Sequence, residues 1–406
     1  MTEILERTEL PLFPFPSGPQ ATPPAEYKEL RESCPFSRVR LPSGDEAILL
    51  VRYADIAQGH ADTRLSHNLT AAGSPRVTVG PSFLDDPQAL FNMDGKDHLR
   101  IRRIVAGAFT PRRTETWKPA IRARADELLD AMERHPGPAL DLVAEYCYLL
   151  PIVIICRLLG VPEQDAPKFR EWSGAFFSGV RLSQEEQQRQ IGEFTAYVMA
   201  LIAQRRAEPG TDLIDDLIAA RDGEDKLTEV ELVYLTTTLI AAGNETIANA
   251  LSRAVLSLLQ DDRALWKQLQ ERPELVPAAV DELLRYNPLG NTATLRLAIE
   301  NVEMSSGTVK AGEAVLMAVY AAMRDEAAYP DADTIRFDRE NPPQQQIFGG
   351  GPHYCLGAHL AKTEMQLGIS MLIERFPDLR LAVDPSELRF SEGEVISALV
   401  DLPVTL

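Results

Sequence analysis

Cysteines are few in this sequence, and they are widely scattered. The chain of 406 residues has four, Cys34, Cys147, Cys156 and Cys355, too few and too dispersed for the disulfide framework of a secreted scaffold. Long apolar runs are also missing, so no segment is suited to crossing a bilayer. Residues 1–24 place acidic residues and prolines where a signal peptide needs a basic patch followed by an apolar stretch. We therefore expect a soluble, cytoplasmic protein with no membrane partner.

Positive charge is also in short supply. The chain has 41 lysines and arginines against 60 acidic residues, a formal net charge of -19. This balance argues against a nucleic-acid partner, because phosphate binding needs clustered Lys and Arg. Basic residues do gather in residues 98–103 ("HLRIRR") and 110–113 ("TPRR"). Charge patterning alone leaves open whether this stretch is a solvated helix face or a docking surface.

The composition that remains is that of a globular protein with a large core. Hydrophobic residues make up 45% of the chain and charged residues 25%, without low-complexity bias. The length would allow two or three domains, but no repeat or linker supports a division. We expect a single domain over residues 1–406.

Helical patterns dominate the chain. Apolar periodicity and helix-forming residues predict helices at residues 117–132, 140–159, 187–206, 228–260, 264–270, 275–286 and 356–374. Strand patterns are short and lie at residues 46–51, 293–299, 313–320 and around 379–383. They do not alternate regularly with the helices. The predicted fold class is mainly α with small β-sheets.

The helix predicted at residues 228–260 is unusually long and apolar on nearly every face, which predicts a buried central helix. Thr228 and Glu231 have the spacing of a capping box at its start. In its middle, "AAGNET" places Glu245 and Thr246 in surroundings that should be dry. Thr246 could simply bond back to a backbone carbonyl, or the pair could serve a function.

A second polar pair lies in "DELLRYNP". Glu282 and Arg285 are separated by three residues and therefore share one helix face. Most such pairs are surface ion pairs of little energetic weight. By itself this motif indicates little.

Cys355 lies in "FGGGPHYCLGAHLA", with a histidine on either side. A zinc site would usually draw paired ligands from two separated segments, and no second Cys or His pair exists. A nucleophilic cysteine would need a general base and an orienting group, which the sequence neither supplies nor excludes.

The glycines around Cys355 suit a third role for its thiol. Gly349, Gly350, Gly351 and Gly357 would let a flat, bulky cofactor approach the backbone while Cys355 ligates its metal. We also expect Cys355 to begin the helix at residues 356–374, where backbone N–H groups and the helix dipole would stabilise a thiolate.

Three motifs together resemble the cytochrome P-450 family. "FGGGPHYCLG" resembles its haem-binding loop, "ELLR" is similar to its E-x-x-R motif, and "AGNET" is similar to its central-helix A-G-x-[DE]-T. They occur in the family's order and at its usual spacing. The similarity covers essentially the whole chain, and the short form looks bacterial. The resemblance implies the cytochrome P-450 fold around a buried haem.

The resemblance also implies catalytic roles for matching residues. Cys355 would ligate the iron of one haem b per chain, and its thiolate would push electron density onto the metal. Glu245 and Thr246 would serve oxygen binding and proton delivery. Ala242 and Gly243 would leave room for dioxygen over the haem.

Other matching residues would hold the cofactor. Four positions match the family's haem-propionate ligands, where a cation lies opposite a carboxylate. These positions are His98, Arg102, Arg296 and His353. The positions that match haem contacts within the cysteine loop are Phe348, Gly349 and Gly357.

Glu282 and Arg285 would form a buried structural pair near that loop. The family usually completes this network with an arginine in F-D-x-x-R. Here "FDREN" places Asn341 at that position and Arg339 two residues earlier. We expect Arg339 to take the role.

The implied activity is a monooxygenase that typically hydroxylates a mid-sized, largely neutral, natural-product-like molecule, using dioxygen and two electrons. The same chemistry could instead close a ring or couple two carbons. The alternative from another class is a haem protein that only binds a ligand or gas, but such a protein has no need of an acid–alcohol pair. The candidate substrate contacts are Leu239, Ala242, Asn291, Thr292 and Ile396.

The electrons would come from a ferredoxin and its NAD(P)H-dependent ferredoxin reductase. The ferredoxin is expected to dock on a cationic patch formed by Arg100, Arg103, Arg112 and Arg113. We expect the protein to be a monomer.

Overall fold

The computed structural model describes residues 10–70, 74–77, 87, 89–177, 182–222, 227–287, 289–290, 293–391 and 396–406. Its internal contacts define two compact units. Unit 1 comprises Met1–Leu99, Asn291–Thr334 and Glu340–Cys355, and unit 2 comprises Arg100–Gly290, Ile335–Arg339 and Leu356–Leu406. The expectation of a single domain over residues 1–406 stays a prediction.

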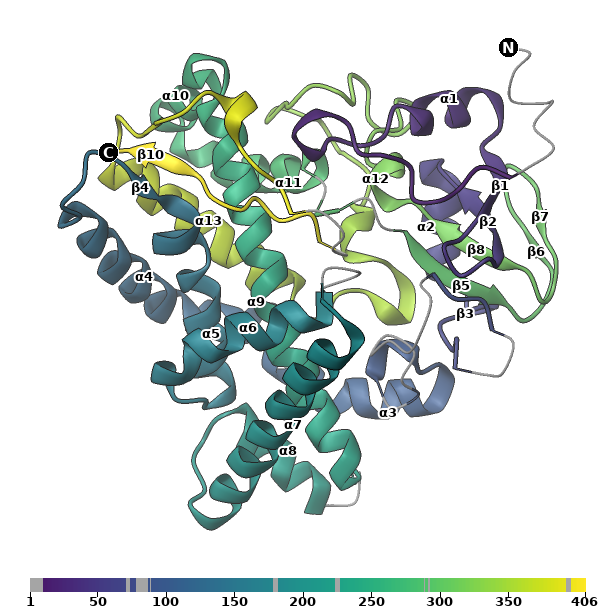
Figure 1. Cartoon of the computed structure of the whole chain (residues 1–406), viewed down its shortest axis with the longest axis horizontal. Coiled ribbons are helices and arrows are strands. Elements are labelled where there is room, and N and C mark those ends of the chain that lie inside the picture. Colours follow the sequence, from purple (N-terminus) through teal and green to yellow (C-terminus); the bar gives the residue numbers. More distant parts are fainter. Residues whose placement is uncertain are drawn as a thin grey trace. The chain divides into compact units, whose positions relative to one another are not determined.

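Unit 1 is built on a five-stranded sheet (Figure 1). Its strands, in spatial order, are β1 (Phe36–Arg40), β2 (Glu46–Leu50), β8 (Ala314–Met317), β5 (Thr294–Ala298) and β3 (Leu65–Ser66). β2 and β8 are parallel, and the other neighbours are antiparallel. A separate hairpin pairs β6 (Val302–Glu303) with β7 (Thr308–Val309).

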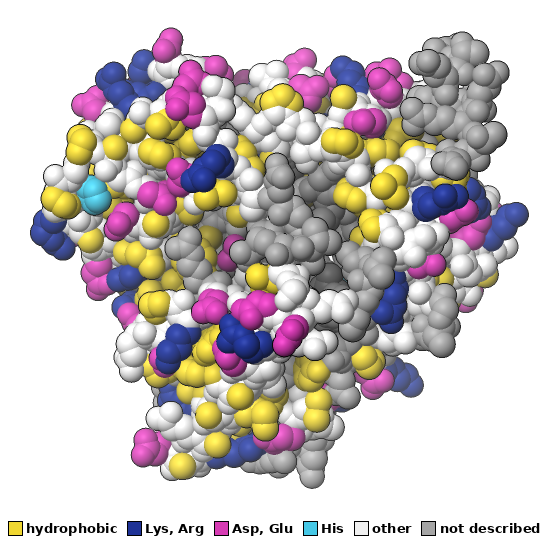
Figure 2. All heavy atoms as spheres, viewed as in Figure 1, with side chains coloured by type: hydrophobic (Ala, Val, Ile, Leu, Met, Phe, Trp, Pro, Cys, Tyr) yellow, Lys and Arg dark blue, Asp and Glu magenta, His cyan; other side chains and the backbone are white. Residues whose placement is uncertain are grey.

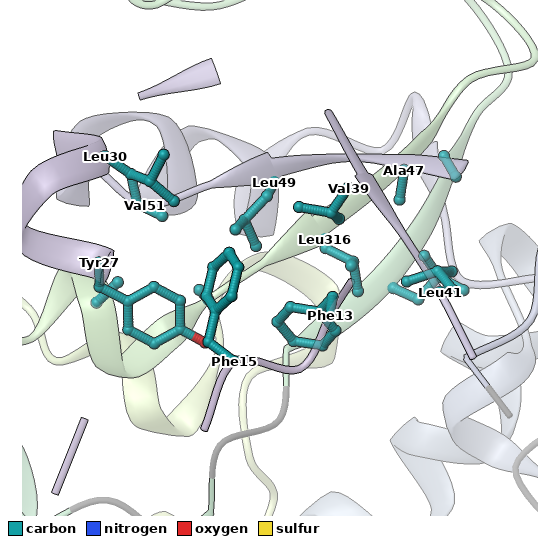
Figure 3. Packing of buried hydrophobic residues seen from close by; sticks show 14 residues of the cluster. Phe13, Phe15, Tyr27, Leu30, Val39, Leu41, Ala47, Leu49, Val51 and Leu316 are labelled. Atoms are coloured by element: carbon teal, nitrogen blue, oxygen red, sulfur yellow. The ribbon is translucent and has the colours of Figure 1, made fainter. Parts of the chain in front are cut away.

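Both faces of this sheet are buried. Ala47 and Leu49 of β2 belong to one hydrophobic cluster, and Ile48 and Leu50 belong to a second, because successive side chains of a strand point to opposite faces. The first cluster includes three aromatic rings (Figure 3). Its Phe15 ring packs edge-on against Phe13 at 6.2 Å and Tyr27 at 5.8 Å between centroids. The helices of unit 1 are α1 (Glu26–Ser33), α2 (Tyr53–Ala61) and α12 (Val319–Ala322).

Unit 2 is helical. After α3 (Gly95–Ala106), which begins in unit 1, its helices are α4 (Pro111–Glu133), α5 (Leu149–Leu159), α6 (Ala166–Phe177), α7 (Gln184–Ala207), α8 (Leu213–Asp222), α9 (Glu229–Leu259), α10 (Ala264–Glu271), α11 (Val276–Tyr286) and α13 (Ala358–Arg375). A three-stranded sheet has the order β4 (Leu140–Asp141), β10 (Pro403–Thr405) and β9 (Arg380–Leu381).

α9 is the central helix of unit 2, as the sequence predicts. It runs for 31 residues, and its flanking Thr228 forms the predicted capping box with Glu231. The Glu231 N–H donates to Thr228 Oγ1 at 3.1 Å, and the Thr228 N–H donates to Glu231 Oε2 at 2.7 Å. Helices that contact α9 include α5, α6, α7, α8, α10, α11 and α13. Its side chains are accordingly buried over most of its length.

The helix predicted at residues 140–159 is wrong in its first half. Leu140–Asp141 form β4 and pair with β10, a π-helical turn follows at Val143–Cys147, and α5 begins only at Leu149. The Leu142 N–H donates to the Leu402 carbonyl, and Asp141 Oδ1 accepts from the Val143 N–H at 3.0 Å. A partner strand from the far end of the chain decides the conformation of this apolar run, since the run itself suits either a strand or a helix.

Charges of both signs mix on the face shown in Figure 2, where Lys and Arg side chains lie among Asp and Glu side chains. Among the exposed ion pairs of the protein, Arg189 pairs with Glu186 and Glu193 at 2.6 Å each. Exposed pairs of this kind contribute little to stability. Within the described residues, no helix is both long and apolar enough to span a membrane.

Candidate active site

The thiol of Cys355 lies at the end of a tightly hydrogen-bonded loop in unit 1. The Cys355 N–H donates to the Phe348 carbonyl at 2.7 Å, and the Gly349 N–H donates to the Gln346 carbonyl at 2.9 Å. Cys355 is exposed and forms no disulfide. Cys147 and Cys156 are buried instead, and burial raises the pKa of both thiols. Cys355 is therefore open to a ligand in a way that these core thiols are not.

The position of Cys355 relative to the following helix differs from the prediction. α13 begins at Ala358, and its N-cap is Gly357. Cys355 precedes that cap by two residues, so it does not begin the helix. The Cys355 N–H instead donates to the Phe348 carbonyl within the loop.

The four glycines of the loop divide into two pairs. A Cβ on Gly350 would lie 3.0 Å from the Cβ of His60, and one on Gly351 would lie 2.7 Å from the His60 carbonyl oxygen. These two glycines let the loop pack against the end of α2, and their predicted role as room for a cofactor stays untested. A Cβ on Gly349 would have its nearest neighbour at 3.6 Å, and one on Gly357 would meet nothing within 4 Å. Open space therefore lies beside Gly357, whereas Gly349 has a φ of 69°, a left-handed conformation that favours glycine.

His60 anchors the start of the same loop. Its Nδ1 lies 2.9 Å from Gln346 Oε1, and Gln346 Nε2 donates to the Gln344 carbonyl at 3.0 Å. Burial lowers the pKa of His60 to about 4. A neutral imidazole therefore fixes Gln346, two residues before Phe348. The sequence offers no signal for this contact.

A cluster of histidines lies beside the loop in unit 1. The His353 ring lies between those of His67 and His98, with centroid separations of 3.4 Å and 3.8 Å and interplanar angles of 12° and 18°. Asp94 Oδ1 lies 3.6 Å from His353 Nε2. The sequence predicted His98 and His353 as cofactor ligands and missed His67 and Asp94.

Arg296 brings a buried positive charge to this cluster. Its side chain donates to the Leu295 carbonyl at 2.7 Å, and burial lowers the pKa of its guanidinium to about 9. Burial, followed by the charges of Arg296 and His353, holds the pKa of His67 far below its usual range. The Arg296 guanidinium is thus a buried cation of this cluster, close enough to Asp94 for their charges to interact. Such a cluster fits a cofactor that carries its own carboxylates.

Arg102 belongs to the same helix as His98. The two residues are four apart on α3 and therefore share one face of it. Arg102 is half-buried, whereas His98 is 1% exposed. The helix thus carries two of the predicted haem-propionate ligands on one face, and that role stays a prediction.

One face of α9 stays open in the middle of this otherwise buried helix. Leu239 and Thr246 are partly exposed and Ala242 is exposed, and their spacing places the three side chains on one side. Thr246 Oγ1 donates to the Ala242 carbonyl at 2.8 Å. The predicted back-bond of Thr246 is therefore present, and the residue also lies on the open face of the helix; its functional role stays a prediction.

Other residues of the "AAGNET" segment have structural contacts. Asn249 Nδ2 donates to the Glu245 carbonyl at 2.8 Å, and the Glu245 side chain is partly exposed. A Cβ on Gly243 would lie 3.0 Å from Cδ1 of Ile155. Gly243 thus allows the close packing of α5 on α9, which is a different reason for a glycine than the predicted room for dioxygen.

The E-x-x-R pair is buried in unit 2. Arg285 donates to Glu282 at 2.7 and 2.8 Å, and the two side chains are 1% and 4% exposed. Arg339 Nε lies 3.0 Å from both oxygens of Glu282. This is the contact expected of the arginine that completes the network.

The predicted substrate contacts differ in how exposed they are. Leu239 and Ala242 lie on the open face of α9, but Ile396 is only 6% exposed and belongs to the core. A side chain so well packed presents little surface to a ligand, so its predicted role is not supported. Asn291 and Thr292 lie outside the described residues.

Glu364 is a buried carboxyl group that the sequence analysis missed. It lies in α13, is 2% exposed, and its Oε2 has no hydrogen-bond partner among the described residues. Burial raises its pKa well above the usual range. The apolar periodicity of residues 356–374 could have signalled it, since a Glu interrupts the inward face.

The comparisons with known proteins agree on one family. A family model described as Cytochrome P450 matches residues 176–388. The mycinamicin IV hydroxylase/epoxidase of Micromonospora griseorubida is 42% identical over 402 residues, covering 97% of this chain and 98% of that protein. The nocardicin C N-oxygenase of Nocardia uniformis subsp. tsuyamanensis is 38% identical, covering 99% of this chain and 100% of that protein.

A solved structure shows the same fold. The cytochrome P450 hydroxylase from the leinamycin biosynthetic pathway of Streptomyces atroolivaceus S-140 matches with a TM-score of 0.90 and 39% identity, covering 98% of this chain and 100% of that chain. The predicted fold and the predicted monooxygenase class are therefore confirmed. With identity at this level over nearly its whole length, the chain belongs to the cytochrome P450 family of monooxygenases, whose cofactor is a thiolate-ligated haem iron.

Proposed function

We propose that Cys355 ligates the iron of one haem b per chain. The observation that carries this assignment is the exposed thiol at the end of a hydrogen-bonded loop. The chemistry that a thiolate-ligated haem supplies is the activation of dioxygen for oxygen insertion into a substrate. The loop's part is to keep the sulfur in place, through the bond to the Phe348 carbonyl.

The haem carboxylates would be held by His98, Arg102, Arg296 and His353. Arg296 is the strongest candidate, because its guanidinium is buried and, among the described residues, donates to the Leu295 carbonyl and to no carboxylate. A cation in such a place is costly unless an anion offsets it. His353 offers a ring held between two others.

Thr246 and Glu245 would deliver protons. The Thr246 hydroxyl donates to the Ala242 carbonyl at 2.8 Å, which leaves its oxygen lone pairs free to accept a proton-carrying hydrogen bond. The partly exposed Glu245 can exchange protons with water and supply them to that hydroxyl.

The substrate would be a mid-sized, largely neutral natural product. The open face of α9 offers Leu239, Ala242 and Thr246, which carry no charge. Apolar pockets with a few polar groups suit neutral ligands. The relatives named as a mycinamicin IV hydroxylase/epoxidase and a nocardicin C N-oxygenase support a biosynthetic role.

Electrons would arrive from an acidic ferredoxin that docks on unit 2, the ferredoxin being reduced by its NAD(P)H-dependent reductase. Arg100 of the predicted cationic patch pairs with Glu231. The proposed docking surface therefore consists of the exposed Arg103, Arg112 and Arg113. Arg112 and Arg113 lie in the first turn of α4, which has no acidic residue. A helix N-terminus disfavours cations. An acidic partner would offset this unfavourable placement.

The test of the proposed ligation is the absorption spectrum of the reduced protein with carbon monoxide. The wild type should show the long-wavelength band of thiolate-bound haem, and Cys355→His should lose it. A Cys355→Ser variant that binds haem and retains the band would refute the assignment. A Cys34→Ser variant is the matched control, since Cys34 is the other exposed cysteine. For the substrate, compounds that shift the haem absorption band on binding identify the class.

A further inference from the structure

His67 holds a place in the cofactor-side cluster that no motif predicts. Its ring is stacked on His353 at 3.4 Å between centroids and 12° between planes. Its Nδ1 lies 3.0 Å from the Phe91 carbonyl, which can only accept, so Nδ1 carries the proton and donates. The orientation of the His67 ring is therefore set by a backbone group, and the ring forms a fixed surface under His353.

The sheet of unit 1 brings His67 to this position. β3 pairs with β5 in a register that sets Leu65 opposite Ala298 and Ser66 opposite Leu297. His67 directly follows Ser66, and Arg296 directly precedes Leu297. His67 and Arg296 therefore lie at the same end of the β3–β5 pairing. Their closeness agrees with the lowering of the His67 pKa by the Arg296 charge.

The residues around His67 also hold the carboxylate that faces His353. Asp94 Oδ2 accepts from Ser66 Oγ at 2.5 Å, from the His67 N–H at 3.0 Å and from the Asn68 N–H at 3.3 Å. Its other oxygen lies 3.6 Å from His353 Nε2. The short segment from Ser66 to Asn68 therefore contacts His353 with the His67 ring and also holds Asp94, which faces His353.

We propose that His67 is a positioning residue of the haem-carboxylate site, whose ring is the platform that fixes His353 for its contact with a haem carboxylate. This inference rests on the proposed roles of His353 and Arg296. His67 itself need not touch the cofactor. Its contribution is to reduce the rotamer freedom that His353 would otherwise lose when the cofactor binds.

The test measures the rate at which haem leaves the holoprotein to an excess of apomyoglobin. We expect His67→Ala to release haem about fivefold faster, the factor that corresponds to an aromatic pair worth about 1 kcal/mol. His67→Phe keeps a flat ring and should stay close to the wild type. Asn68→Ala removes a neighbouring exposed side chain while leaving the backbone bonds to Asp94, and it should match the wild type.

The outcomes separate this inference from the assignment on which it rests. If His67→Ala releases haem at the wild-type rate, or if His67→Phe releases it as fast as His67→Ala, the platform role is wrong. If Arg296→Gln and His353→Ala also leave the rate unchanged, the proposed carboxylate site itself fails. The band of the reduced carbon monoxide complex, recorded for each variant, shows that the Cys355 loop is intact in the proteins compared.

Discussion

The Nε atom of Arg339 lies 3.0 Å from both carboxylate oxygens of Glu282. Arg285 binds the same carboxylate from within α11. The buried Glu282 carboxylate thus binds two arginines that are 54 residues apart in the chain. The arginine usual in F-D-x-x-R is replaced in this protein by one that comes two residues earlier.

Arg339→Gln should destabilise the fold by about 1–3 kcal/mol, because it removes hydrogen bonds to a buried charged group. Arg285 would still pair with Glu282, so the loss should be smaller than for Arg285→Gln. Urea unfolding of both variants measures the two losses. Arg336→Gln is the control, since that side chain is 41% exposed and pairs with Asp338 at the surface. Equal stability of Arg339→Gln and Arg336→Gln would contradict the assigned role.

Thr246→Ala should keep haem and substrate binding but lose efficient proton delivery. Reducing equivalents should then drain into hydrogen peroxide, so the ratio of product formed to reduced nicotinamide consumed should fall by about tenfold or more, within the usual range for proton-transfer groups. A surrogate redox chain provides the electrons. Thr237→Ala is the matched control, because Thr237 makes the same back-bond on α9, to the Val233 carbonyl, but is buried. If Thr246→Ala forms as much product per reduced nicotinamide as the wild type, Thr246 has no role in proton delivery and only bonds back to the helix.

Glu364 should make the stability of the protein fall as pH rises. Its folded-state pKa is raised by burial, so the folded protein binds a proton more tightly than the unfolded chain does. The contribution is favourable below the unfolded pKa and is lost as pH rises toward the folded pKa. Glu364→Gln should therefore melt at a higher temperature than the wild type, by a margin that grows as the pH rises above the ordinary Glu pKa of about 4.3.

The melting curves of Glu374→Gln provide the comparison for Glu364. Glu374 lies on the same helix but is exposed, so its variant should follow the wild type at every pH. If the margin of Glu364→Gln does not change with pH, the carboxyl group is not buried as a neutral acid.

Arg112→Glu combined with Arg113→Glu should slow electron transfer from an acidic ferredoxin by about tenfold or more at low ionic strength. Substrate affinity should not change. The difference should shrink with added salt, because the Debye length falls from about 10 Å at 0.1 M to about 3 Å at 1 M. Stopped-flow reduction measures the rate. Arg134→Glu, with the same reversal of charge beyond the other end of α4, should behave as the wild type, and an equal effect there would argue against local docking.

Local signals in the sequence determined several parts of this protein. The capping box at Thr228 and the apolar residues that follow it predict α9 almost to its ends, because a helix is made of contacts between residues three and four apart. Cys355, its glycines and the two helix motifs identify the family, because each is a short run whose chemistry is readable from its residue types. The three helices predicted at residues 187–206, 264–270 and 275–286 are confirmed for the same reason.

Only the tertiary structure decided which distant residues the residues of those motifs contact. Gly350 and Gly351 serve the contact with His60, and Gly243 serves the contact with Ile155. Residues 140–141 become a strand because β10 pairs with them. The cluster of His67, Asp94, Arg296 and His353 joins side chains from four distant segments of unit 1. Such contacts depend on how strands and loops pack, and residues hundreds of positions apart leave no pattern within a local window of sequence.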